Sequence, residues 1–368
     1  MRDKNSAHTL CHSCPKLCRP VCPVSDVEQN EATTPWGKMT TMRLLDEKAL
    51  PLNQENLSLA YKCLGCSASE GACEMKNPVP KTLESYRIQA FQAGLAPDSM
   101  MKYSRRFLKE FNPFGIHLGD VLRNHFPKKS KEKRKIIYFP GCTEIAKNPA
   151  AVEDTLDLLQ EFTDAEIGLP PQPVSCCGYP LYAAGDWDNF VEQAEVMSST
   201  LRDCSLVISG APSCLYTMET LYREAGHPCT TRFTHLTQYL EHLIPQKIQK
   251  KTRSNQPQVA YHDPCYLGRT RGVYEAPRRL IEKVSGQAPL EFQRNRQQSY
   301  CCGAGGLLPI SSPETARKIT QNRIEEFKET RAQVLVTGCP TCVSRFQKVD
   351  KGISVKNLAD YLKDEIRK

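Results

Sequence analysis

The sequence feature that most constrains the fold is an internal duplication within residues 135–368. The triplet Cys-Cys-Gly occurs twice, at 176–178 and at 301–303, so the two copies lie 125 residues apart. In both halves a short apolar segment followed by a cysteine precedes the triplet, and a β-branched segment followed by another cysteine comes after it. This repeated order predicts two copies of one folding unit.

Each half of the duplication alternates strand-like and helix-like segments. The β-branched and apolar segments predict strands at 136–139, 206–209, 259–261 and 334–337. The remaining segments predict helices at 151–162, 189–202, 236–240, 275–284, 313–330 and 358–362, and Ser312 followed by Pro313 is a helix-start signal. Alternation of this kind predicts small α/β units, each with a mostly parallel sheet.

Five cysteines of the duplicated region follow a predicted strand. This group comprises Cys142, Cys214, Cys265, Cys339 and Cys342. In open α/β sheets, ligands bind outside the carboxyl ends of the strands, and helix N-termini at that edge favour an anionic guest. A cluster ligated by thiolates is such a guest, so we expect these cysteines to ligate metal.

The chain has 368 residues, of which 18 are cysteine. Its N-terminal sequence has no apolar stretch behind a basic start, and no run of 18 apolar residues occurs, so we expect neither a signal peptide nor a membrane span. In a reducing cytoplasm, metal ligation explains the thiols better than disulfides do. We therefore expect a cytoplasmic protein, with any contact to the inner face of a membrane made through partner subunits.

The first hundred residues contain two cysteine runs of the ferredoxin type. The first run is Cys11, Cys14, Cys18 and Cys22, and the second is Cys63, Cys66 and Cys73 followed by Asn77. In two-cluster ferredoxins the fourth cysteine of each run serves the other cluster. The pattern therefore predicts one complete cubane [4Fe–4S] site, formed by Cys63, Cys66, Cys73 and Cys22.

The other N-terminal site has only three thiols, those of Cys11, Cys14 and Cys18, and Asn77 occupies the fourth position. A [3Fe–4S] cluster, a cubane cluster with a non-cysteine ligand and an empty site all remain open at this point. Two zinc sites are the structural alternative. Zinc prefers closed sets of four nitrogen or sulfur ligands, and the crossed pattern fits iron better.

The third constellation consists of Cys265, Cys301, Cys302, Cys339 and Cys342. The doubled pattern Cys…Cys-Cys-Gly…Cys-x-x-Cys resembles the CCG cysteine-rich domains of heterodisulfide-reductase-related proteins, which include the iron–sulfur subunits of glycolate oxidase, lactate-utilisation systems and anaerobic glycerol-3-phosphate dehydrogenase. The resemblance implies that these five cysteines bind a non-cubane [4Fe–4S] cluster. It also implies an α/β chain with an all-α N-terminal domain: a helical ferredoxin-like domain at 1–100, a basic linker at 101–134, and CCG domains at 135–250 and 256–368.

The first CCG domain departs from the family pattern. It offers the thiols of Cys142, Cys176, Cys177 and Cys214, but Ala211 stands where the second domain has Cys339. A cluster and a degenerate, metal-free domain are both compatible with four thiols. Cys204 and Cys229 match no motif, and we expect them to pack in apolar surroundings.

Several neighbours of the second Cys-Cys pair are candidates for tuning a cluster. Gly303, Gly305 and Gly306 either bring backbone N–H groups close to cluster sulfurs, which would shift the reduction potential, or form a tight turn. His262 and Asp263 precede Cys265 and either relay protons or make structural hydrogen bonds. The same glycines do not form a phosphate loop, because no Lys-Ser or Lys-Thr follows them.

These sites predict an electron-transfer subunit of an oxidoreductase complex. Clusters carry single electrons, and the sequence lacks a strand-to-helix Gly-x-Gly-x-x-Gly for a flavin or nicotinamide. The resemblance implies a flavoprotein dehydrogenase or another redox subunit as partner, with a quinone or a thiol/disulfide carrier downstream. The alternative is a disulfide reductase that uses the five-cysteine cluster, although Ala211 puts in doubt the second of the two clusters that this family reaction employs.

The formal net charge of +8 would also suit a nucleic-acid-binding protein. Three thiolate-ligated cubanes of charge about −2 each would bring the loaded protein near neutrality. Much of the remaining basic excess lies at 128–135, without interleaved aromatic residues, which is typical of a solvated linker. We therefore expect no nucleic-acid partner, and a zinc-stabilised scaffold is the third and weakest alternative.

Overall fold

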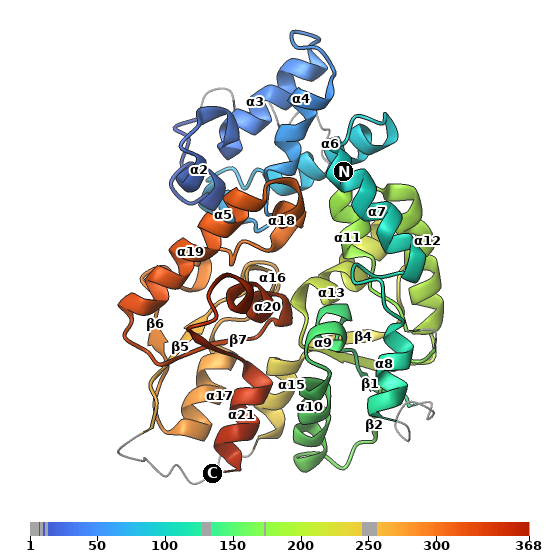
Figure 1. The fold of residues 1–368 in the computed structure, drawn as a ribbon, viewed down its shortest axis with the longest axis vertical. Helices are drawn as coiled ribbons and strands as arrows, with labels where there is room; N and C mark the ends of the chain where they lie inside the picture. The colour runs from blue at the N-terminus through green and yellow to red at the C-terminus, as the bar shows by residue number, and fades with distance from the viewer. Residues whose placement is uncertain are drawn as a thin grey trace.

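The computed structural model describes Ala7, Leu10, Cys11 and residues 14–126, 134–172, 174–244 and 256–367. Most of the basic run that we predict to be a linker, residues 128–133, lies outside the described residues. Three units are visible in Figure 1: a helical unit up to residue 126, a first α/β unit at 134–244 and a second α/β unit at 256–367. In the described ranges, no helix is both long enough and apolar enough to cross a membrane.

The described residues of the helical unit form helices and no strands. These are α2 (Pro23–Glu28), η1 (Glu31–Thr33), α3 (Pro35–Asp46), α4 (Gln54–Ser58), η2 (Leu59–Tyr61), α5 (Ala68–Ala72), α6 (Val79–Gln92), α7 (Asp98–Glu110) and α8 (Leu118–His125). α3 has two local start signals: Pro35 occupies its first turn, and the Thr34 hydroxyl accepts from the Gly37 N–H at 2.9 Å. Helix α8 and most of α7 fall within the stretch that we expect to connect the domains.

The first α/β unit begins at the predicted strand and follows the predicted order. Its elements are β1 (Ile136–Tyr138), α9 (Cys142–Lys147), α10 (Pro149–Glu161), β2 (Ile167–Gly168), α11 (Tyr179–Ala184), α12 (Trp187–Thr200), β3 (Leu206–Ser209), α13 (Pro212–Tyr216), the π-helical η4 (Thr217–Leu221), α14 (Tyr222–Glu224), β4 (Arg232–His235) and α15 (Leu236–Leu243).

The second α/β unit repeats this order. Its elements are β5 (Val259–His262), α16 (Cys265–Gly268), α17 (Glu275–Ser285), β6 (Leu290–Glu291), η5 (Arg296–Gln298), η6 (Gly305–Leu307), α18 (Leu308–Ser311), α19 (Pro313–Glu329), β7 (Val334–Thr337), α20 (Pro340–Val349), β8 (Ser354–Asn357) and α21 (Leu358–Ile366). Helix α19 starts at Pro313 with Ser312 at its N-cap, but the Ser312 side chain makes no capping hydrogen bond to the described residues.

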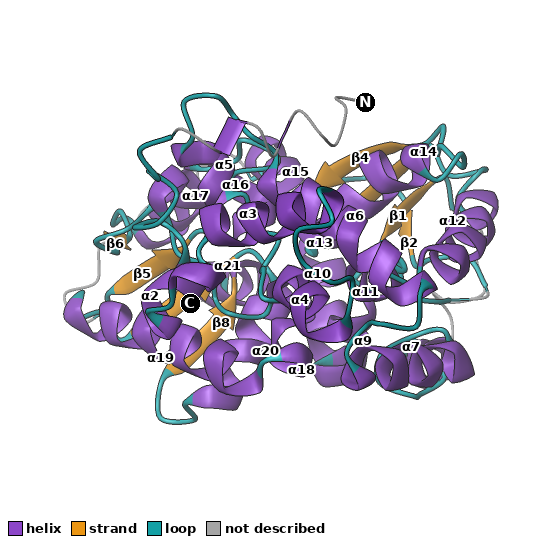
Figure 2. Cartoon of the chain, turned by 90° about the horizontal axis from the view of Figure 1, so that it is seen from above, coloured by secondary structure: helices purple, strands orange, loops and turns teal. Residues whose placement is uncertain are grey.

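Each α/β unit contains one four-stranded parallel sheet, drawn in orange in Figure 2. The strand orders, β2-β1-β3-β4 and β6-β5-β7-β8, are the same in both units. Register pairs Ile136 with Leu206 in the first sheet and Val259 with Val334 in the second. The prediction of two duplicated α/β units with mostly parallel sheets is confirmed.

The two α/β units contact each other in reciprocal fashion. Helix α10 packs on α21 and α15 packs on α17. At the end of β4, His235 accepts the Thr237 N–H on Nδ1, so its Nε2–H donates to the Gly338 carbonyl of the other unit at 3.2 Å. At the end of β8, the Asn357 amide donates to Oε1 of Glu144 at 3.3 Å. Equivalent strand ends thus bring the two cysteine-rich edges together.

One buried arginine, Arg87 on α6, joins all three units. Its guanidinium donates at 2.6–3.1 Å to backbone carbonyls of the helical unit (Ala60 and Cys63), the first α/β unit (Ala183) and the second α/β unit (Gly306). A buried charge is tolerated when all its donors are satisfied. Arg87 therefore fixes the helical unit, shown in blue and cyan in Figure 1, against the edges that carry the cysteines.

Candidate metal centre

The sheet topology places the cysteines at the point where the strand order reverses. In both sheets this switch lies between the two central strands, β1 and β3 or β5 and β7. Cys142 begins α9 directly after β1, and Cys265 begins α16 directly after β5. Cys214 in α13 and Cys342 in α20 follow the other central strands. Ligands of open α/β sheets bind in this crevice.

All five cysteines of the second α/β unit come together. Their thiols form one hydrogen-bonded chain in the order Cys265, Cys301, Cys302, Cys342 and Cys339. Four of the five residues are buried, and Cys265 is half-buried. A buried cluster of thiols without disulfides is the arrangement expected of a metal-ligand set. We call this group the second thiol site.

The four cysteines of the first α/β unit also gather, and we call them the first thiol site. The Sγ atoms of Cys142 and Cys176 lie 3.2 Å apart, and the chain of thiols continues through Cys177 to Cys214. All nine cysteines of the two sites line one cavity of about 490 Å³. The structure therefore brings both sites to a shared space between the α/β units.

Three buried nitrogen donors surround the second thiol site without hydrogen-bond partners among the described residues. They are Nε2 of His262, Nη2 of Arg269 and Nη2 of Arg345. Burying a donor without an acceptor costs about 1–3 kcal/mol. An anionic iron–sulfur cluster on these cysteines would supply sulfur acceptors for such donors. These donors therefore fit an iron–sulfur cluster, which is the cofactor that the cysteine pattern predicts.

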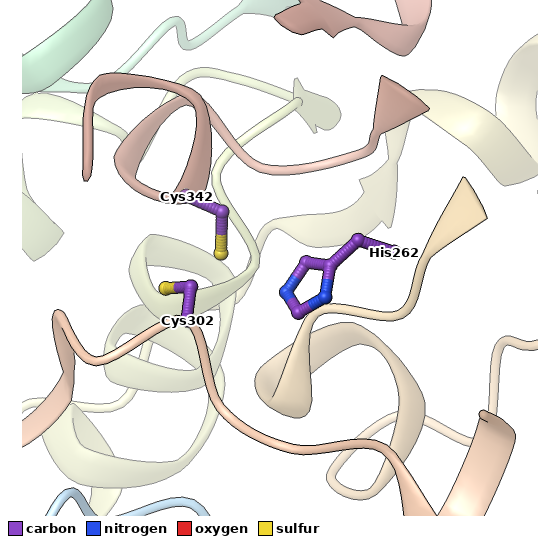
Figure 3. A group of neighbouring side chains, drawn as sticks. All are labelled: His262, Cys302 and Cys342. Atoms are coloured by element: carbon purple, nitrogen blue, oxygen red, sulfur yellow. The ribbon is translucent and has the colours of Figure 1, made fainter. Parts of the chain in front are cut away.

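The tautomer of His262 indicates whether this site suits an iron–sulfur cluster or a single metal ion. His262, Cys302 and Cys342 converge, with their ligand atoms within 4.8 Å of one another (Figure 3). Nε of Arg323 donates to Nδ1 of His262 at 3.2 Å. Burial and the charge of Arg323 hold the pKa of His262 far below its ordinary value, so the ring is neutral and carries its one proton on Nε2. Because a protonated nitrogen cannot ligate, this tautomer makes His262 a hydrogen-bond donor towards the thiols rather than a zinc ligand.

Arg269 lies where the helical unit meets the second thiol site. Its Nε donates to the Cys66 carbonyl at 2.5 Å, and its Nη1 donates to the carbonyls of Gln297 and Ser299. Burial alone would lower the pKa of Arg269, but the thiols of Cys66, Cys265 and Cys301 raise it. One guanidinium therefore faces a cysteine of the predicted cubane site and two cysteines of the second thiol site.

The first thiol site lacks all three of these donors. The positions that match His262, Arg269 and Arg345 in the duplication carry Phe139, Ala146 and Thr217. Ala211, which replaces the fifth cysteine, is buried. The Cys177 thiol there accepts hydrogen bonds from Cys176 and Cys214, and then from the Tyr179 N–H and the Thr217 hydroxyl, and all of these lower its pKa. The first thiol site therefore has donors of its own, but it lacks the histidine and the two arginines that surround the second thiol site.

The glycines after the second Cys-Cys pair have two roles. The N–H groups of Gly303 and Gly305 donate to the Cys301 thiol and lower its pKa. A Cβ at Gly305 would lie 2.2 Å from the Leu64 carbonyl oxygen, and one at Gly306 would lie 2.1 Å from that of Cys63. Only glycine allows this loop to reach both the cysteine and the helical unit.

The N-terminal sites are less completely described, because residues 12 and 13 lie outside the described part. Nδ2 of Asn77 donates to Sγ of Cys11 at 3.1 Å, and Asn77 Oδ1 is buried with no partner among the described residues. Burial raises the pKa of the Cys11 thiol most, and the neighbouring Cys14 and Cys18 raise it further. Asn77 thus lies beside the three-thiol group.

The second run lies next to the second thiol site. Cys22, Cys63 and Cys66 line one small cavity. Cys73 is half-buried and is among the groups that raise the pKa of Cys11, so its thiol lies near that of Cys11. Burial raises the pKa of Cys66 to about 12, although Arg269 lowers it. The Cys66 thiol is therefore neutral unless a metal holds it as a thiolate.

The remaining candidates have structural roles. Asp263 receives two hydrogen bonds of 2.8 Å from the Arg278 guanidinium and a third from the Arg296 N–H. Cys204 is buried and Cys229 is partly buried against the core of the first unit. Sequence analysis missed Arg269 and Arg345. Their spacing was a usable signal, because each follows a cysteine by one helical turn, after Cys265 and Cys342.

Comparison with known protein families agrees with this geometry. The family of the CCG cysteine-rich domain matches residues 136–219 and 259–347. Each α/β unit thus carries a match to the CCG cysteine-rich domain. Each match begins at the first central strand of a unit and includes its whole thiol site.

Relatives of this two-CCG chain are components of oxidoreductases. One component of the dihydromethanophenazine:CoB–CoM heterodisulfide reductase from Methanosarcina acetivorans is 28% identical over 77% of this chain and 71% of its own length. One component of the CoM/CoB fumarate reductase from Methanothermobacter marburgensis is 25% identical over 77% of this chain and 55% of its own. An EtfAB:quinone oxidoreductase from Syntrophomonas wolfei is 22% identical over 77% of this chain and 42% of its own length. The chain is homologous to iron–sulfur subunits of oxidoreductases, which supports iron–sulfur clusters as its cofactors.

Proposed function

We propose that this chain is a cytoplasmic iron–sulfur subunit that relays electrons between a flavoprotein dehydrogenase and a second carrier. The relay would use a cubane cluster on Cys22, Cys63, Cys66 and Cys73 of a ferredoxin-like helical domain and a five-cysteine cluster at the second thiol site. A third cluster would lie on Cys11, Cys14 and Cys18. The first thiol site would hold no cluster.

The observation that carries this proposal is the arrangement around Arg269. Its guanidinium binds the carbonyl of Cys66 and faces Cys265 and Cys301. Electron transfer between two clusters requires that they lie close together in a rigid frame. The glycine contacts to the Cys63 and Leu64 carbonyls and the four hydrogen bonds of Arg87 provide that frame.

When bound, the clusters would supply one-electron chemistry. The residues of this chain would set the potential. His262, Arg269, Arg345 and the N–H groups of Gly303 and Gly305 place N–H donors around the sulfurs, and such donors favour the more reduced, more negative state. Most of these thiols are buried, which lowers the dielectric constant around a cluster. The names of the heterodisulfide reductase and EtfAB:quinone oxidoreductase relatives support a multi-subunit complex and a quinone as a downstream carrier.

The experiment is anaerobic purification followed by iron and sulfide counts and low-temperature EPR across a redox titration. We expect about eleven or twelve irons per chain with matching sulfide, and signals of at least two interacting clusters on reduction. Stoichiometric zinc with little iron or sulfide in protein never exposed to air would refute the electron relay.

The shared cavity supports a second candidate, a disulfide reductase. The cavity of about 490 Å³ gives access to all nine cysteines, and Arg106, Lys147 and Lys348 add positive charge to its wall. A disulfide would accept two electrons and two protons there and leave as two thiols. Steady oxidation of a reduced viologen dye by an added disulfide, abolished by Cys301→Ser, would favour this candidate over the pure relay.

A further inference from the structure

A second large cavity lies between the helical unit and the second α/β unit, and Tyr266 lines both it and the cavity shared by the thiol sites. Its volume is about 800 Å³, within the range of cavities that hold small molecules. Gly65 and Ser67 bring it beside Cys66, and Tyr266 and Tyr300 bring it beside Cys265 and Cys301. It therefore adjoins cysteines of two predicted clusters.

Positively charged side chains are prominent in the wall of this cavity. Lys76, Arg269 and Arg294 line it, and in the described part of the chain none of the three has a carboxylate within ion-pair distance. Lys81 also lines it but pairs with Glu224. The acids of the wall are Glu70 and Glu84, and burial raises the pKa of both carboxyls. Even with both carboxyls ionised, the three cations without a carboxylate partner outnumber these two acids, so the cavity is suited to an anion.

Aromatic rings form the rest of the wall. Tyr216, Tyr266, Tyr274 and Tyr300 all line the cavity. The rings of Tyr216 and Tyr266 lie 5.3 Å apart, and the Arg294 guanidinium lies 4.0 Å from the centre of the Tyr300 ring. Tyrosines and a stacked arginine bind flat rings by stacking and by cation–π attraction.

We propose that this cavity binds a small aromatic anion, the class to which ring-based electron carriers with a carboxylate or phosphate group belong. The ring would lie among the tyrosines, and the anionic group would meet Arg294 and Lys76. A concave site of this size fits a small molecule better than the acidic face of a protein partner, because such a face needs a flat and extended surface. The inference rests on the proposed function only for the redox role of the ligand.

The experiment is calorimetric titration of the anaerobic, fully oxidised holoprotein with naphthoquinone sulfonate, so that no electron is exchanged. We expect binding that weakens with added salt, and neutral naphthoquinone should bind at least about tenfold more weakly. Arg294→Gln and Lys76→Gln should each weaken binding of the sulfonate by about fivefold to tenfold. The matched control is Arg317→Gln on α19, which removes an exposed arginine that pairs with Glu314 and should not change binding.

Equal affinity for the charged and neutral rings, or no effect of either cavity variant, would overturn the proposal. Iron content, sulfide content and the EPR spectrum are measured on each sample. If Arg294→Gln misfolds, Lys76→Gln tests the cavity in its place. Wild-type protein that carries its clusters but does not bind the sulfonate overturns the cavity proposal and leaves the electron relay standing. Protein that contains no clusters refutes the electron relay. Even in that protein, binding of the sulfonate supports the cavity proposal, and absence of binding overturns it.

Discussion

Arg323 donates from Nε to Nδ1 of His262 at 3.2 Å, and this single contact decides what the imidazole can do. The proton of the neutral ring must lie on Nε2, which is buried and points to Cys302 and Cys342 (Figure 3). A ring fixed in this tautomer cannot ligate a metal, but it can donate to a cluster sulfur. The histidine that resembles a zinc ligand in position therefore supports an iron–sulfur cluster.

Replacing His262 should lower the reduction potential of the cluster at the second thiol site. His262→Phe copies Phe139 of the first unit and removes one N–H donor. Because such donors stabilise the reduced state, we expect a shift of roughly 40–130 mV, which corresponds to about 1–3 kcal/mol for a one-electron couple. EPR-monitored redox titration measures it. His242→Phe, on the exposed face of α15, is the control, and an unchanged potential in His262→Phe would contradict the prediction.

The duplication offers a matched pair of cysteines for testing which thiol site holds iron. Cys176 and Cys301 occupy equivalent positions, but among the described residues only the second site is surrounded by a histidine and two arginines with unpartnered donors. Cys301→Ser should remove about four irons per chain, and Cys176→Ser should leave the iron count unchanged. Iron and sulfide analysis of both variants decides the matter. Equal losses would mean that the first thiol site also carries a cluster.

Much of the fold could be predicted from the sequence, and the reason is local. The central strands are β-branched and buried on both faces, so their apolar runs mark 206–209 and 334–337 closely. The edge strands could not be found in the same way. β4 and β8 have polar sequences, Arg-Phe-Thr-His and Ser-Val-Lys-Asn, because one side of each strand has no neighbour.

Replacing Asn77 should complete the three-thiol site. The Asn77 amide lies 3.1 Å from Sγ of Cys11, so a cysteine at position 77 would bring a fourth thiol there. We expect Asn77→Cys to add about one iron per chain and to replace an oxidised [3Fe–4S] EPR signal by a reduced [4Fe–4S] signal. The control is Ser199→Cys, which adds a thiol to the exposed face of α12. An identical spectrum in Asn77→Cys would mean that the wild-type site already holds a cubane or no cluster.

The contacts that assemble the units could not be predicted from one sequence. Arg87 donates to Gly306, which is 219 residues away, and Tyr61 donates to Ala184, which is 123 residues away. Neither residue lies in a motif, and a buried arginine looks like a surface residue in sequence. The cysteine spacing indicated what each site contains, but the distances between the sites come only from the fold.

Replacing Arg87 should loosen the three units. A lysine ammonium cannot span carbonyls of Ala60, Cys63, Ala183 and Gly306, and each acceptor left unpaired costs about 1–3 kcal/mol. We expect Arg87→Lys to lower the free energy of unfolding by about 2–4 kcal/mol in anaerobic urea titrations. Arg105→Lys on the exposed side of α7 should have little effect. Equal midpoints for the two variants would show that Arg87 does not hold the units together.

Asp360 on α21 should make stability depend on pH. Burial, then Asp154 and Asp364, raise the pKa of this carboxyl from 3.8 to about 6, and its Oδ1 has no partner in the described part of the structure. A raised pKa means that the folded state holds the proton more tightly, so stability falls as pH rises from about 4 to 6. Asp360→Asn removes this loss and should raise the free energy of unfolding at pH 7.5 by about 1–2 kcal/mol. The gain should shrink towards pH 5, as measured by thermal unfolding at both pH values. Asp203→Asn, at an exposed position outside α21, should give no gain. A gain from Asp360→Asn that is the same at both pH values would rule out titration as its cause.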